Sequence, residues 1–120
     1  MKKRLLLGAL LLVAVIGCKD GKAIFDRKMK LSEESTEILK KNLSDCNKLG
    51  KAYGDWREKN LERRQKNDKE WLSLSESTRK ELIAKHGGKA WKQQTHVIVR
   101  AALRCNAAMK QALKRGRTNK

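Results

Sequence analysis

Apolar and polar residues follow two different patterns along this chain. Near the amino terminus, an almost unbroken apolar run extends from Leu5 to Ile16, directly after the basic residues Lys2, Lys3 and Arg4. From residue 32 onward, apolar residues instead recur every three or four positions, with charged and amide side chains between them. The run is shorter than the roughly 20 residues that a membrane-spanning helix needs, whereas the later spacing is typical of amphipathic helices.

The first amphipathic segment predicts one long helix, from residue 33 to about residue 66. Ser32 supplies an N-cap, and Glu33 and Glu34 place negative charge in the first turn, where the helix dipole favours it. Gly50 and Gly54 each weaken such a helix by about 1 kcal/mol without ending it. The apolar stripe of this segment consists of Leu39, Leu43, Cys46, Leu49, Tyr53 and Trp56.

Two further segments complete the predicted helices. A short helix capped by Ser75 runs through Ala84 and stops at Gly87 and Gly88, since glycine is the usual left-handed terminator of a helix. A second long helix runs from Lys89 to about Arg115. Its expected inward face consists of Trp91, Ile98, Ala102, Cys105, Met109 and Leu113, broadened by Val97, Val99, Ala101 and Ala108.

These elements predict an all-α fold: an antiparallel hairpin of the two long helices plus a short third helix. The chain of 120 residues contains no proline, one Phe and one Tyr, a composition that favours helices. We expect a helical domain over residues 32–115. Residues 18–31 lack a sustained period and are expected to form a flexible basic tether, and residues 116–120 a frayed basic tail.

The amino terminus has the order of charged, apolar and small residues that characterises a secretory signal. Its last four residues, Val15-Ile16-Gly17-Cys18, resemble the cleavage box of bacterial lipoprotein signals. The resemblance implies that residues 1–17 are a signal peptide, cut between Gly17 and Cys18. It also implies that Cys18 receives diacylglycerol on its sulfur and an acyl chain on its new amino group. Two or three acyl chains hold a protein firmly on a membrane, and this covalent lipid is the only cofactor that we expect.

The resemblance also indicates a location. In enteric bacteria, Asp directly after the lipidated cysteine retains a lipoprotein in the inner membrane. Here Lys19 occupies that position, and Asp20 comes one residue later. We therefore expect a lipid-anchored protein of the cell envelope, with the periplasmic face of the outer membrane favoured over the inner membrane.

Two cysteines remain once Cys18 carries lipid. Cys46 and Cys105 each lie in the apolar stripe of one long helix, and an even pair in an oxidising periplasm predicts a disulfide. If the helices are antiparallel with these cysteines opposite each other, Ile38 falls opposite Leu113, and Leu61 falls near Ala90 and Trp91. The stripes would then meet apolar partners at both ends.

Charge narrows the class of partner. The net charge is +17, and loss of the three basic residues of the signal lowers it to +14. Such a charge favours anionic partners: an acidic protein, or an anionic polymer of the envelope. Basic residues near Tyr53, Trp56, Trp71 and Trp91 resemble a nucleic-acid platform, but three of these aromatics fall on predicted core stripes. We therefore do not expect nucleic acid as the partner.

No pattern for catalysis or metal binding emerges. His86 and His96, taken with the two cysteines, match no zinc spacing, and oxidised cysteines cannot act as nucleophiles. Acidic residues alternate with Lys or Arg, as on a solvated helix face. Residues 18–120 are therefore expected to contain no catalytic residue and no metal site, and we predict no enzyme activity and no small-molecule substrate.

These observations lead to one leading hypothesis and two alternatives. The first is a non-catalytic interaction module of the exclusion, immunity or secretion-accessory type, displayed from a membrane and binding through a basic helical surface. The second is a structural envelope component such as an outer-membrane spanin-like lysis subunit, although those proteins tend to be rich in proline. The third is an inhibitor of a wall-cleaving enzyme.

Overall fold

The computed structural model describes the backbone of residues 2–117 and the side chains of residues 21–117. Over this range the chain forms helices and no strand, which confirms the all-α prediction. The elements are α1 (Lys2–Lys41), α2 (Cys46–Lys59), α3 (Leu61–Ser73), α4 (Glu76–Leu82), a π-helical turn (Ile83–Gly87), α5 (Gly88–Arg104) and α6 (Asn106–Lys114).

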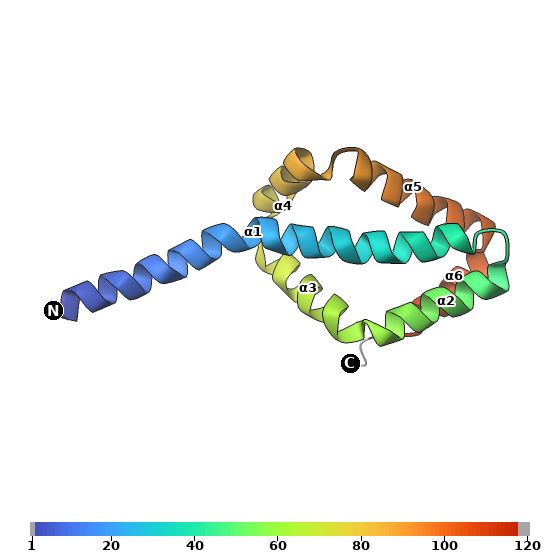
Figure 1. Cartoon of the computed structure of the whole chain (residues 1–120), viewed down its shortest axis with the longest axis horizontal. Coiled ribbons are helices and arrows are strands. Elements are labelled where there is room, and N and C mark those ends of the chain that lie inside the picture. Colours follow the sequence, from blue (N-terminus) through green and yellow to red (C-terminus); the bar gives the residue numbers. More distant parts are fainter. Residues whose placement is uncertain (1, 118–120) are drawn as a thin grey trace.

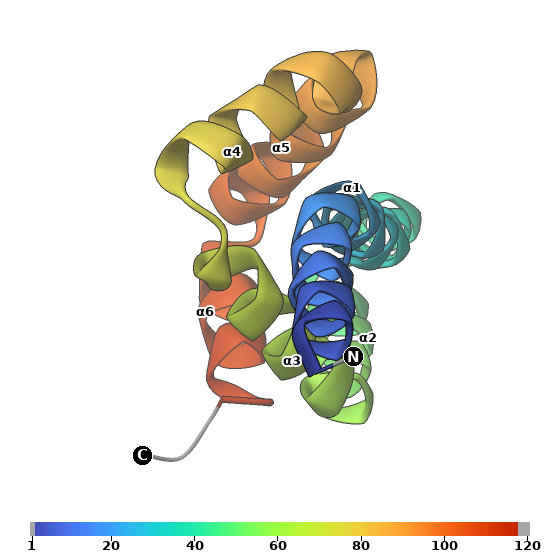
Figure 2. The ribbon, with the colours of Figure 1, turned by 90° about the vertical axis from the view of Figure 1, so that its left-hand side faces the viewer.

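Helix α1 is the central element of the fold. It runs through the middle of the molecule, with α4 and α5 on one side and α2, α3 and α6 on the other, while its amino-terminal half extends beyond the other helices (Figure 1). The end-on view shows the same arrangement (Figure 2). Within residues 21–117, no helix combines the length and the apolar content needed to cross a membrane.

The two cysteine-bearing segments run parallel, so the predicted antiparallel register between them is wrong. From the Cys46–Cys105 bond onward, contacts advance in the same direction along both segments: Gly50 lies against Ala108, and Asp55 pairs with Arg115. An antiparallel hairpin does exist, but α1 forms it with α2 and α3. Its contacts reverse direction, since Glu34 pairs with Arg63 and Arg27 with Glu70.

The core lies where the two parallel segments bend. It comprises Leu39, Leu49, Val97, Ala101, Cys105 and Met109, with Leu43, Cys46, Tyr53 and Ala108 packed against it. The first predicted stripe is thus confirmed from Leu39 to Tyr53, whereas Trp56 lies outside this core. The second is confirmed only in part. Val97, Ala101, Cys105 and Met109 are buried as predicted, whereas Ile98 and Leu113 are 39% and 41% exposed and Ala112 is buried in place of Leu113.

The expected flexible tether is instead helical in its described part, and it packs into the domain. Residues 21–31 belong to α1, where Ile24 is 4% and Phe25 is 1% exposed. The Phe25 ring lies 5.8 Å from that of Trp71 and 6.2 Å from that of Trp91. Asn67 of α3 is also buried, and its amide donates to the Ile24 carbonyl at 3.1 Å.

The boundary predicted at Ser32 is also wrong. Ser32 lies inside α1, and its carbonyl accepts hydrogen bonds from the Ser35 and Thr36 hydroxyls. Because these hydroxyls are satisfied by their own helix, Ser35 and Thr36 can be buried although they are polar. The predicted helix 33–66 is interrupted after Lys41, and Asp45 caps α2 by accepting from the backbone N–H groups of its first turn.

The remaining helix boundaries show where local sequence signals predicted the end of a helix correctly. Ser75 caps α4, as predicted, by accepting from the Thr78 N–H. The stop at Gly88 is confirmed by its positive φ of 49°. The predicted helix 89–115 is divided at Cys105, whose backbone leaves helical geometry. Gly116, at the start of the predicted frayed tail, is held in place because its carbonyl accepts from Arg64. Residues 118–120 of that tail lie outside the described residues.

Gly50 and Gly54 allow α2 and α6 to approach closely. A Cβ atom at Gly50 would lie 3.0 Å from the Cβ of Ala108 and 3.3 Å from its carbonyl oxygen. At Gly54, a Cβ atom would meet the Arg115 side chain. Glycine lowers the stability of a helix, and here that loss is offset by the close packing of the two helix backbones.

Candidate functional site

The predicted site residues fall into two groups. The side chains of Gly17 and Cys18 lie outside the described residues, so cleavage and lipid attachment stay predictions. Cys46 and Cys105 form the predicted disulfide, with an S–S distance of 2.07 Å and a Cα–Cα distance of 5.3 Å. The bond joins the first residue of α2 to the break between α5 and α6.

The two histidines lie apart from this bond. His86 is in the π-helical turn with its ring 6.4 Å from that of Phe25, and His96 is exposed on α5. Among the side chains of residues 21–117, no group of three His, Cys, Asp or Glu residues is placed to hold a metal ion.

One face of α5 is strongly basic. Lys89, Lys92, His96 and Arg100 recur at three- and four-residue steps along α5, which places them on one side of the helix. All four are exposed. We call this surface, together with Val99 and Leu103 beside it, the basic α5 face. The opposite side of α5 carries Val97 and Ala101 into the core.

The charge of the basic α5 face is not neutralised within the described chain. No Asp or Glu follows Glu81 in the sequence, so α5 and α6 contain no acidic residue. Three arginines outside α5 do form ion pairs with carboxylates: Arg27 binds Glu70, Arg63 binds Glu34, and Arg115 binds Asp55 and Glu58. Within residues 21–117, Lys89, Lys92 and Arg100 form no ion pair.

Apolar side chains are exposed on the same face. Leu103 is 80% and Val99 is 48% exposed. Single exposed apolar residues are common on protein surfaces, but here two of them lie close to Arg100 on the basic α5 face. The helical spacing from Lys89 to Leu103 in the sequence already places these cations and apolar residues on one face. This face was missed in the sequence because Val99 was assigned to the inward side of the helix.

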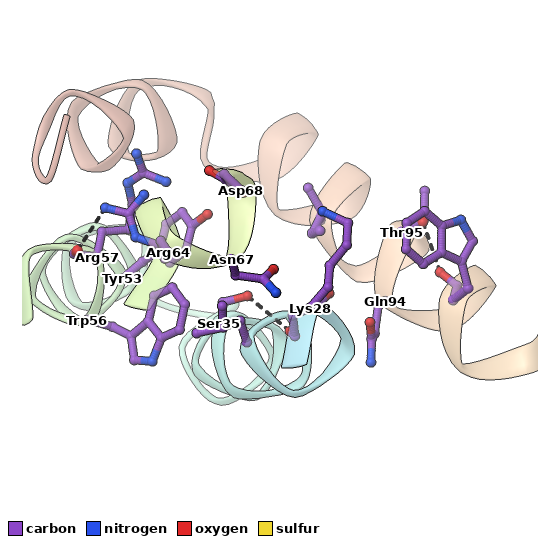
Figure 3. Close-up of a pocket in the computed structure, with 14 residues that line it drawn as sticks. Lys28, Ser35, Tyr53, Trp56, Arg57, Arg64, Asn67, Asp68, Gln94 and Thr95 are labelled. Atoms are coloured by element: carbon purple, nitrogen blue, oxygen red, sulfur yellow. Dashed lines mark hydrogen bonds between the residues drawn. The ribbon is translucent and has the colours of Figure 1, made fainter. Parts of the chain in front are cut away.

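A second candidate site is a cleft of about 360 Å³ beside α1. Residues of α1 line it on one side, residues of α2 and α3 on a second, and residues of α5 on a third (Figure 3). We call it the central cleft. Its lining residues are Lys28, Leu31, Ser32, Ser35, Tyr53, Trp56, Arg57, Arg64, Asn67, Asp68, Trp91, Gln94, Thr95 and Ile98.

The central cleft carries an excess of positive charge. It contains Lys28, Arg57 and Arg64 but one carboxylate, that of Asp68. Arg57 donates to the carbonyls of Leu113 and Arg115 at the end of α6, where a cation complements the helix dipole. None of the three cations forms an ion pair with a residue in the described range 21–117.

Arg64 is the most constrained of these cations. Its Nη2 donates to the carbonyls of Arg57 and Gly116, whereas its Nε is buried without a hydrogen-bond partner among the described residues. An unsatisfied buried donor costs about 1–3 kcal/mol. Burial lowers the pKa of the Arg64 guanidinium, and the nearby charge of Arg57 lowers it further. The charge of Asp68 acts in the opposite direction without outweighing these effects, and Asp68 forms no ion pair with Arg64 among the described residues.

Aromatic rings flank these cations. Tyr53 and Trp56 are stacked with their centroids 6.4 Å apart, and the Arg57 guanidinium lies 5.8 Å from the Tyr53 ring. Trp91 lines the α5 side. The three aromatics were predicted as core residues, yet each is half-buried and forms part of the cleft wall.

Comparison with protein-family models, curated proteins and solved structures found no match to this chain.

Proposed function

We propose that this protein is a lipid-anchored lipoprotein of the bacterial envelope, and that its helical domain is a non-catalytic interaction module. The module binds an acidic protein through the basic α5 face. The observation that carries the proposal is a cationic stripe on α5 that has no carboxylate partner within residues 21–117 and lies beside exposed Val99 and Leu103. The amino-terminal anchor rests on the Val15-Ile16-Gly17-Cys18 motif.

The exposed apolar residues favour a protein over an anionic polymer. Unpaired surface cations attract any polyanion and steer its approach. A polysaccharide or polyphosphate chain gains nothing from Leu103, which is 80% exposed. An acidic helix with its own apolar stripe would cover both the cations and Leu103, in the usual manner of amphipathic helix recognition.

The packing of residues 21–31 supports a position close to the membrane. Side-chain packing of the domain already includes Gly21, which lies near Leu82 and Thr78, only three residues after Cys18. A lipid on Cys18 therefore leaves room for no long spacer. The proposed module acts near the membrane surface, and its partner must come within reach of that surface.

Binding to defined probes tests the basic α5 face. The full chain in a non-ionic detergent is titrated with a synthetic amphipathic peptide that alternates Glu and Leu at helical spacing, with polyglutamate of equal charge, and with lipopolysaccharide. We expect the peptide to bind more tightly than the other two. Its affinity should fall at least tenfold between about 50 and 500 mM salt, because exposed charges are screened.

Matched variants identify the surface. Arg100→Glu and Lys92→Glu should weaken peptide binding strongly, whereas Lys69→Glu, the same charge change on exposed α3, should not. Leu103→Ser should remove the preference for the peptide over polyglutamate. Equal binding of polyglutamate, or preferred binding of lipopolysaccharide, refutes the acidic-protein partner. Binding that ignores salt refutes the basic α5 face altogether.

The anchor has a separate test. The chain is expressed in a diderm bacterium, and its intact mass is compared with that of Cys18→Ser. The natural chain should lose residues 1–17, gain the mass of two or three acyl chains, and fractionate with the outer membrane. An unmodified thiol at Cys18 would contradict the anchor without affecting the peptide-binding result.

A further inference from the structure

We infer that the central cleft binds a small organic anion, a carboxylate or phosphate monoester joined to a flat apolar group. This site is separate from the basic α5 face and does not depend on the proposed function. The volume of about 360 Å³ is in the range of small-molecule sites, which combine apolar walls with a few convergent polar groups.

The charges of the cleft favour an oxyanion. Lys28, Arg57 and Arg64 come from three different helices and line one cleft, against the single carboxylate of Asp68. Elsewhere in the described chain, Arg27, Arg63 and Arg115 are paired with Glu or Asp. The cleft thus concentrates cations that the fold itself does not neutralise, and guanidinium groups suit the two acceptor oxygens of a carboxylate or phosphate.

Arg57 and Arg64 are already placed for this role. Their hydrogen bonds to the carbonyls of Leu113, Arg115 and Gly116 fix both side chains against the end of α6. These bonds leave the buried Nε of Arg64 without a partner among the described residues. On the α5 side, Oε1 of Gln94 is also buried without a partner there. Both residues line the cleft, with these two unpaired atoms buried beneath its surface.

The flat apolar group follows from the rings. Tyr53 and Trp56 stack almost parallel, at 12°, and Trp91 and Ile98 line the α5 side. Figure 3 shows Tyr53 and Trp56 near the two arginines, with Lys28 extending along the cleft. A ligand whose anionic end meets the cations can therefore place a ring against an aromatic wall.

The test measures binding of defined probes to the full chain in dodecyl maltoside. Benzoate and phenyl phosphate are titrated while tryptophan fluorescence is recorded, because Trp56 and Trp91 both line the cleft. We expect saturable binding of one or both anions, at least tenfold tighter than that of neutral benzamide. The stronger of the two identifies the carboxylate or the phosphate as the natural anionic group.

Two matched variants in α1 test whether the anion binds in the cleft. Lys28→Gln should weaken anion binding about tenfold, as expected for loss of one charge-assisted contact. Lys22→Gln, which removes an exposed charge outside the cleft, should have no effect. Because Arg64→Gln also loses two internal hydrogen bonds, its folding is checked by circular dichroism before its affinity is interpreted.

Several results would overturn the inference. They are absence of saturable binding by either anion, equal affinity for benzamide, and an unchanged affinity in Lys28→Gln. Arg100→Glu should leave anion binding intact, so that failure of the basic α5 face and failure of the central cleft are distinguishable.

Discussion

Cys46 and Cys105 are bonded to each other at the bends of two helical segments that run in the same direction. Cys46 begins α2 immediately after the turn that follows α1, and Cys105 separates α5 from α6. Cys105 is only 3% exposed and lies in the core with Leu39 and Leu49. The bond therefore connects the two bends at the point where the buried side chains converge.

Removal of this disulfide should strongly destabilise the fold. The bond closes a loop with a sequence separation of 59, and loop-closure entropy assigns about 4 kcal/mol to a loop of this size. For a domain of about 100 residues, that loss lowers Tm by about 20 °C. Thermal melting followed by circular dichroism, with and without a phosphine reductant, measures the effect, and Cys46→Ala/Cys105→Ala should match the reduced protein. An unchanged Tm would contradict the prediction.

Phe25→Ala tests whether residues 21–31 belong to the domain. Phe25 is 1% exposed between Trp71 and Trp91, and loss of a buried phenyl ring costs about 3–5 kcal/mol. Urea unfolding should show that loss, whereas Asp26→Ala, an exposed neighbour, should stay within about 0.5 kcal/mol of the natural chain. If the two variants were equally stable, this stretch would be a tether after all.

Gly50→Val should separate α2 from α6. The new side chain would collide with Ala108, including its backbone carbonyl, and overpacking of this kind costs about 1–3 kcal/mol. Lys48→Val introduces the same residue at an exposed position of α2 and controls for the lower helix propensity of valine. Unfolding free energies that agree for the two variants would show that close packing at Gly50 contributes nothing.

Glu34 should make stability depend on acid pH. Hydrogen bonds from Arg63, both at 2.9 Å, and one from Trp56 lower the pKa of Glu34 in the folded state. A lowered carboxyl pKa stabilises the fold fully above the unfolded value of about 4.3. This stabilisation disappears as pH falls through the lower folded value.

The measurement compares Tm from pH 7 to pH 2.5 for the natural chain and Glu34→Gln. Because the Glu34 side chain is about one third exposed, we expect the two proteins to differ in the free energy of unfolding by at most about 1 kcal/mol at neutral pH. The corresponding difference in Tm should disappear as the pH is lowered. Arg63→Gln should show the same convergence, and Glu33→Gln, an exposed neighbour, should not. A pH-independent difference would remove Glu34 as the titrating group.

Local signals in the sequence predicted much of the secondary structure correctly. Ser75 and Gly88 mark real helix boundaries, because capping and positive φ depend on neighbouring residues only. The stripe from Leu39 to Tyr53 correctly identified the inward residues of the first segment. Signals were missed where burial was polar: Ser35, Thr36 and Asn67 interrupt the apolar pattern, yet all three are buried.

The candidate sites were predictable to different degrees. The basic α5 face follows from the spacing of Lys89, Lys92 and Arg100 and from the absence of acidic residues after Glu81. The central cleft does not. Lys28, Arg57 and Arg64 come from different helices, and no spacing in the sequence indicates that their charges meet.

The sequence by itself determined that this protein is helical, which faces of its first segment turn inward, and that Cys46 and Cys105 pair. The tertiary structure alone decided the direction in which the cysteine-bearing segments run. An apolar stripe identifies the residues that face a partner helix, but it looks the same whether that helix runs parallel or antiparallel. A single disulfide at the middle of both segments is compatible with either direction. The choice depends on long-range packing: Gly50 against Ala108, Phe25 between two tryptophans, and a break at Cys105 that no proline or glycine announces.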